Sequence, residues 1–122
     1  MEKTNEEYSL LYDFYGELLS GRQREAFELY YEENLSLSEV ADIVGVSRQA
    51  VHITLGNANR ELEKYEGKLK LIEKQAAFDE KLKEALLKMD ILLKNKELMA
   101  GLDKETAKEL RRIKKSIKEL EI

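Results

Sequence analysis

Apolar residues recur along the middle of the chain at a spacing that places them on one side of a long helix. They are separated alternately by four and three residues, at Val51, Leu55, Ala58, Leu62, Tyr65, Leu69, Ile72 and Ala76. An unbroken run of this spacing is typical of a helix that supercoils against a partner. It predicts one long helix from Arg48 to about Ala76. The spacing loses phase between Gln75 and Asp79, where we expect a kink or short break, and it then resumes at Leu82, Leu86, Met89 and Leu93.

The composition favours an all-α fold. The 122 residues include no proline and no cysteine, and they are rich in Ala, Glu, Lys, Leu and Arg, as long helices are. Without cysteine there is no disulfide framework or thiol nucleophile, and a single histidine does not make a zinc site. We therefore expect a helical protein with no metal and no cofactor.

Two helices are predicted ahead of this run. The first extends from about Glu6 to Leu19, because apolar residues recur there at helical spacing, at Tyr8, Leu11, Tyr12, Tyr15, Leu18 and Leu19. Ser20 with Gln23 forms a capping box for the second helix, which we expect to end near Asn34.

A helix-turn-helix is predicted between about residues 37 and 57. Ser36 with Glu39 forms a capping box for a short helix, about Leu37 to Val44, which Gly45 ends in a left-handed turn. Ser47 then caps the next helix. The inward-facing residues of the short helix should be Val40, Ile43 and Val44, and the small Ala41 should lie where the two motif helices cross.

The start of the second motif helix carries side chains that can read bases. With Val51 and Leu55 facing inward, Arg48, Gln49 and His52 should face outward, with Thr54 as a further candidate. Arginine suits guanine and glutamine suits adenine, while the free amides of a first turn favour phosphate. The predicted nucleic-acid-binding residues are Ser47, Arg48, Gln49, His52 and Arg60.

The C-terminal segment predicts a further helix with a narrow apolar side. Gly101 should stop the preceding helix and Asp103 should cap the last one, whose stripe comprises Leu110, Ile113, Ile117 and Leu120. An accessory basic patch lies beside it, at Arg111, Arg112, Lys114 and Lys115. This patch could bind RNA or the acidic N-terminal helices, or it could be a solvent-exposed side of the helix with no binding role. We expect a helix-turn-helix domain at 1–76 and a helical extension for dimerisation or partner binding at 77–122.

The net charge and the missing catalytic motifs limit which classes of function the chain can have. The net charge is -4, so any nucleic-acid binding must come from a local patch. No catalytic constellation or phosphate loop is visible, which indicates a protein that is not an enzyme and has no small-molecule substrate. The N-terminus has no signal pattern and no apolar run is long enough to span a membrane, so we expect a cytoplasmic protein without membrane insertion.

The motif and its flanks resemble known families. The stretch LSLSEVADIVGVSRQAVH at 35–52 resembles the helix-turn-helix of sigma factor region 4. YSLLYDFYGELL at 8–19, ELYY at 28–31 and ELEKYE at 61–66 are similar to the YlxM family. This resemblance implies a helix-turn-helix regulator associated with the signal recognition particle pathway, with the particle's RNA and proteins as candidate partners.

Two functions remain open from the sequence. One is a regulator that binds DNA or RNA through the motif, as a homodimer joined by the long helix and the C-terminal helices. The other is a protein-protein adaptor that keeps the motif as a scaffold. A DNA reader usually surrounds its recognition helix with Lys and Arg, and this helix has few.

Overall fold

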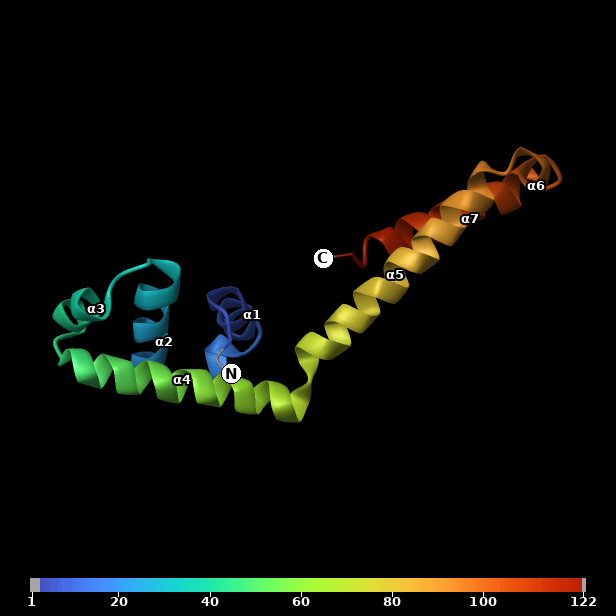
Figure 1. Ribbon diagram of the computed structural model, residues 1–122. Helices are drawn as coiled ribbons and strands as arrows, with labels where there is room; N and C mark the ends of the chain where they lie inside the picture. The colour runs from blue at the N-terminus through green and yellow to red at the C-terminus, as the bar shows by residue number, and fades with distance from the viewer. Residues whose placement is uncertain (1–2, 122) are drawn as a thin grey trace. The chain divides into compact units, whose positions relative to one another are not determined.

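The computed structural model describes residues 3–121, and every regular element among them is helical (Figure 1). The all-α prediction is confirmed. The chain divides into two compact units, a front unit that ends at Ile72 and a rear unit that begins at Glu73.

The front unit contains four helices whose starts are fixed by local caps. They are α1 (Asn5–Tyr15), α2 (Gly21–Phe27), α3 (Leu37–Val44) and α4 (Arg48–Leu69), with a 3-10 turn at Gly16–Leu18 and a π-helical turn at Glu28–Glu32. The capping boxes predicted at Ser20 and Ser36 are both present, and Gly45 takes the left-handed conformation at a φ of 81°. The helix-turn-helix therefore lies where the sequence predicts it.

The core of the front unit forms on one side of α4. Helices α1, α2 and α3 all pack against α4 and bury its apolar side, at Val51, Leu55, Ala58 and Leu62. Phe27 and Val40 are fully enclosed beside them. These four residues form the first half of the run with four-and-three spacing, and the chain's own helices cover them. For this half of the run, the prediction that the helix supercoils against a partner is wrong.

One apolar residue of α3 does not face the core. Val40 is buried and Val44 is half-buried, but Ile43 is 61% exposed, so the prediction that Ile43 faces inward is wrong. At about 100° per residue, Ile43 is rotated too far from the side shared by Val40, Ala41 and Val44.

Helix α4 ends earlier than the spacing predicts. Lys70 adopts a left-handed conformation, with φ 55° and ψ 34°, and α5 (Leu71–Lys94) begins directly after it. The prediction of one helix to about Ala76 is therefore wrong. The predicted break between Gln75 and Asp79 is also wrong, since α5 is continuous there.

A buried tyrosine supports this early end. Tyr15 is 1% exposed, its hydroxyl donates a hydrogen bond to Glu66 Oε1, and it accepts one of 3.0 Å from the Leu71 N–H. Glu66 Oε1 also accepts a hydrogen bond of 3.1 Å from the Ile72 N–H. First-turn N–H groups have no partner within their own helix, so these contacts pair two of them. Burial and the Glu66 carboxylate raise the pKa of Tyr15.

The rear unit is a helical hairpin. Most of α5 belongs to it, followed by α6 (Lys96–Ala100) and α7 (Lys104–Lys118), which runs back along α5 (Figure 1). Asp103 caps α7 as predicted, accepting a hydrogen bond from the Thr106 N–H. Between the two long helices lie Leu82, Leu86 and Ala107, and an ion pair joins Lys114 to Asp90.

We predict that Tyr15→Phe destabilises the front unit by about 1–3 kcal/mol, because it removes both hydrogen bonds of the buried hydroxyl and leaves the Leu71 N–H unpaired. Thermal unfolding followed by circular dichroism measures this change. An unchanged melting temperature would show that the tyrosine does not hold the start of α5.

Two glycine substitutions should have opposite effects. A Cβ at Gly16 would lie 2.7 Å from the ring of Tyr12, which is stacked on Phe27, so Gly16→Ala should cost about 1–3 kcal/mol. Gly67 has open space at the same position, and Gly67→Ala should stabilise α4 by up to about 1 kcal/mol. Denaturant titration of both variants compares them, and a destabilised Gly67→Ala would contradict the packing described here.

Candidate nucleic-acid interface

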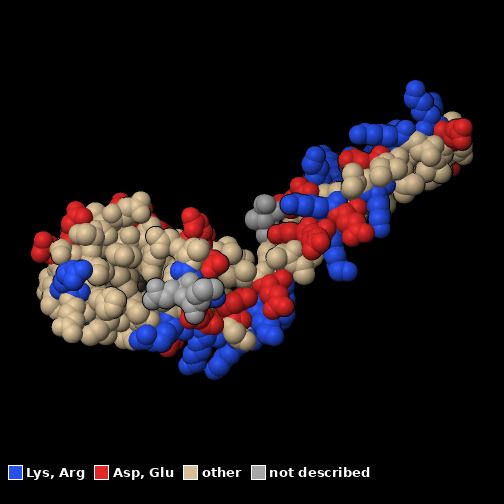
Figure 2. All heavy atoms as spheres, in the orientation of Figure 1, with Lys and Arg blue, Asp and Glu red and all other residues tan. Residues whose placement is uncertain are grey.

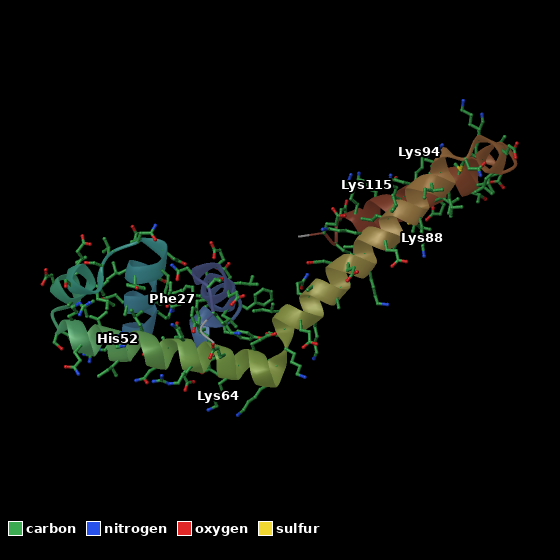
Figure 3. All side chains as sticks on the ribbon, in the orientation of Figure 1. Phe27, His52, Lys64, Lys88, Lys94 and Lys115 are labelled. Carbon is green, nitrogen blue, oxygen red and sulfur yellow. The ribbon has the colours of Figure 1, made fainter. Side chains whose placement is uncertain are left out.

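The first turn of α4 brings three predicted side chains together. The Ser47 hydroxyl accepts a hydrogen bond of 3.0 Å from the Ala50 N–H and so fixes the start of the helix. Arg48, Gln49 and His52 are exposed and line, with Leu37 of α3, a shallow hollow of about 440 Å³. Figure 3 shows His52 near the start of α4. The hollow joins both helices of the motif and is open to solvent.

Arg60 lies apart from this hollow, about three turns farther along α4. Its guanidinium donates a hydrogen bond to Asn57 Oδ1 and lies over Gly56, where a Cβ would be 3.5 Å from Nη1. The positive charge is thereby held one turn nearer the start of the helix than its own backbone position. Arg60 can contact a phosphate there, but it does not share a hollow with Arg48.

Ile53, and not Thr54, faces outward beside His52. Thr54 is half-buried and lines a small cavity with Arg22 and Val46, so the prediction that it faces outward is wrong. Ile53 is 53% exposed and follows Gln49 by one turn. Ile53 is not among the predicted outward-facing residues, although its place outside the four-and-three spacing is visible in the sequence.

Two lysines extend the outward side of α4. Lys64 and Lys68 are exposed and follow Arg60 at intervals of four residues, which places them on successive turns of one side. Figure 3 labels Lys64 on this helix, and Figure 2 shows basic side chains gathered along it. The four-residue interval is visible in the sequence, but Lys64 and Lys68 are not among the predicted binding residues.

The accessory basic patch is divided in the rear unit. Arg111, Lys114 and Lys115 line a groove of about 400 Å³ between α5 and α7, together with Lys94, Lys118, Leu93 and Asp90. Arg112 is not among these lining residues, and its guanidinium pairs with Glu109 at 2.8 Å. Lys94 was missed because its place beside α7 depends on the fold of the hairpin.

Residues 3–121 contain neither a candidate metal-binding cluster nor a candidate membrane-spanning helix. No group of three or more histidine or acidic side chains in this range could hold a metal ion. None of the helices in this range is long and apolar enough to cross a membrane.

Comparison with known proteins identifies the family. A family model described as "Putative helix-turn-helix protein, YlxM / p13 like" matches residues 1–120. The chain belongs to this family, UPF0122. The match covers the rear unit as well as the motif, so the hairpin of α5 to α7 is part of the family's sequence pattern and extends beyond the helix-turn-helix.

Curated relatives support this membership. The UPF0122 protein of Thermoanaerobacter sp. (strain X514) is 38% identical over 116 residues, which cover 93% of each chain. That of Desulforamulus reducens is 46% identical over 82 residues, or 67% of this chain and 70% of the relative. The protein of Caldanaerobacter subterraneus subsp. tengcongensis is 52% identical over 66 residues, covering 54% of this chain and 56% of the relative.

Proposed function

We propose that this UPF0122 protein is a non-catalytic regulator that binds nucleic acid through the start of α4. One observation carries the proposal: Arg48, Gln49 and His52 are exposed together around one hollow, while the opposite side of the same turns is sealed into the core. A helix anchored in this way presents its outward side as a rigid reading surface.

The outward side chains suit a groove of a duplex. Arg48 can form a bidentate pair with guanine, and Gln49 can do so with adenine. Ile53 offers an apolar surface of the kind that contacts the methyl group of thymine. Arg60 supplies a cation for the phosphate backbone.

The first turn of α4 has few cations that could contact phosphates. Beyond Arg48, the cations on the outward side of α4 begin only at Arg60, about three turns along the helix. The affinity of the first turn should therefore fall gently with salt, at about -0.9 in log-log slope per phosphate contacted on DNA. The association with the signal recognition particle that the sequence resemblance implies makes the particle's RNA the first natural ligand to test beside DNA.

A protein-protein adaptor is the second candidate, favoured by a different hollow in the front unit. The residues that line this hollow of about 600 Å³ are the apolar Leu10, Leu11 and Ile72, the acidic Glu7, Glu63 and Glu66, and also Lys3 and Gly67. Three carboxylates against one lysine give this hollow a net negative charge, which suits a basic segment of a protein. The proteins of the signal recognition particle are the implied candidates. Pull-down from native lysate with and without nuclease separates the two functions, because an adaptor keeps its partner after nuclease treatment.

Self-association is proposed through one face of the rear hairpin. Phe78 and Leu92 lie on one side of α5. Helix α7 runs antiparallel to α5, and the ion pair of Lys114 with Asp90 shows which sides of the two helices face each other. At about 100° per residue, Ile113 and Leu120 then lie on the same side of the hairpin as Phe78 and Leu92. All four are exposed, at 43–55%. A pair of such hairpins can bury these faces against each other as a four-helix bundle, which makes a homodimer.

Arg48→Ala should weaken binding to the preferred sequence by about 1–3 kcal/mol and relax the preference at one base pair. The preferred sequence is selected from random duplex pools, and fluorescence anisotropy measures the affinity. Arg112→Ala is the control, because Arg112 pairs with Glu109 in the rear unit. Binding that is indifferent to Arg48 would favour the adaptor.

Leu92→Lys with Ile113→Lys should convert the dimer to a monomer of 14.2 kDa, because the two charges would be buried in the interface. Leu87→Lys with Ile91→Lys is the matched control, since both residues are exposed, at 62% and 61%, on the other side of α5. Light scattering at tens of micromolar gives the mass. A monomeric parent protein, or a dimer that survives the first pair of substitutions, would contradict the proposed face.

A further inference from the structure

We propose that the groove between α5 and α7 is a second nucleic-acid site, which binds the phosphate backbone of a duplex without reading its sequence. The groove is lined by five basic side chains from two helices, Lys94, Arg111, Lys114, Lys115 and Lys118. This site goes beyond the proposed function of α4 and stands without it, because all its residues belong to the rear unit.

The charge of the groove is strongly one-sided. Among the described residues that line it, Asp90 is the one acidic side chain, and it is paired with Lys114. This pair fixes α7 against α5 and leaves the remaining four cations without a carboxylate among the lining residues. The bond to Lys114, together with the charges of Lys94 and Lys118, lowers the pKa of Asp90, as expected where cations from both helices surround one carboxylate.

The dimensions suit a backbone. Arg111, Lys115 and Lys118 follow one another at intervals of four and three along one side of α7 and span about 10 Å at 1.5 Å per residue. Each strand of a duplex carries one charge per about 3.4 Å of helix axis, so this row faces about three phosphates. Figure 3 shows Lys94 and Lys115 on the two helices that form the groove.

The chemistry of the groove favours a backbone over bases. Apart from Asp90, its polar side chains are lysines and one arginine, which bind phosphates, and the described residues that line it include no Asn or Gln that could read a base edge. The rear unit also carries its exposed apolar residues Ile113 and Leu120 outside this lining. The basic groove and the proposed apolar face therefore have no lining residue in common.

The test compares two triple variants with the same loss of charge. Lys94→Gln, Lys115→Gln and Lys118→Gln remove three of the five cations that line the groove, whereas Lys81→Gln, Lys88→Gln and Arg112→Gln remove three cations that do not line it. The probes are random-sequence duplexes of RNA and of DNA and vesicles containing phosphatidylserine. Anisotropy over a salt series gives the duplex affinities and their salt slopes, flotation reports vesicle binding, and circular dichroism confirms that each variant is folded.

The groove triple should weaken duplex binding about tenfold or more at low salt and reduce the salt slope by about two to three, whereas the control triple should change neither by much. Binding to one duplex type alone identifies RNA or DNA as the source of the phosphates. Equal effects of the two triples would overturn the proposal, as would a groove-dependent binding of vesicles in place of duplexes.

A charge-increasing variant keeps the proposal testable if the triples unfold. Asp90→Asn removes the one carboxylate and frees Lys114, so duplex binding should tighten and its salt slope should steepen by about one. Weaker binding by a folded Asp90→Asn protein would contradict the site. Failure of the α4 proposal is distinguishable, because Arg48→Ala then has no effect on sequence preference while the groove triple still reduces the salt slope.

Discussion

The burial of one side of α4 is the interaction on which the front unit depends. Val51, Leu55, Ala58 and Leu62 are enclosed by α1, α2 and α3, and burying a single large aliphatic side chain is worth about 1.5–3 kcal/mol. Because this side holds the unit together, the outward side of the same helix does not have to contribute to folding. It can therefore carry Arg48, Gln49 and His52, which cost nothing in packing and are available to a ligand.

The end of α4 depends on a long-range contact that completes this arrangement. Tyr15 of α1 reaches Glu66 and the Leu71 N–H, so the first helix of the chain supports the turn at Lys70. A lysine in the left-handed conformation is unfavourable by about 1–2 kcal/mol, and two first-turn N–H groups beside it are paired in return. The first helix of the rear hairpin, α5, thus starts separately from α4.

The sequence predicts what is locally determined and misses what depends on distant residues. The caps at Ser20, Ser36 and Asp103 and the turn at Gly45 were all predicted, because each requires only residues within about one turn. The break at Lys70 was missed because Tyr15 lies 51 residues before Glu66. For the same reason, the patch predicted around Arg111 and Lys115 lacks Lys94 of α5, which lines the same groove. It also includes Arg112, which pairs with Glu109 outside the groove.

Helix α4 is structural on one side, and we propose that it binds nucleic acid on the other. Titration of the ¹⁵N-labelled protein with a selected duplex, followed by two-dimensional NMR, tests it most directly. We expect the resonances of Arg48, Gln49, His52 and Ile53 to shift most within the front unit, while those around Leu10 and Glu63 stay in place. Shifts concentrated around Leu10 and Glu63, with the start of α4 unaffected, would contradict it.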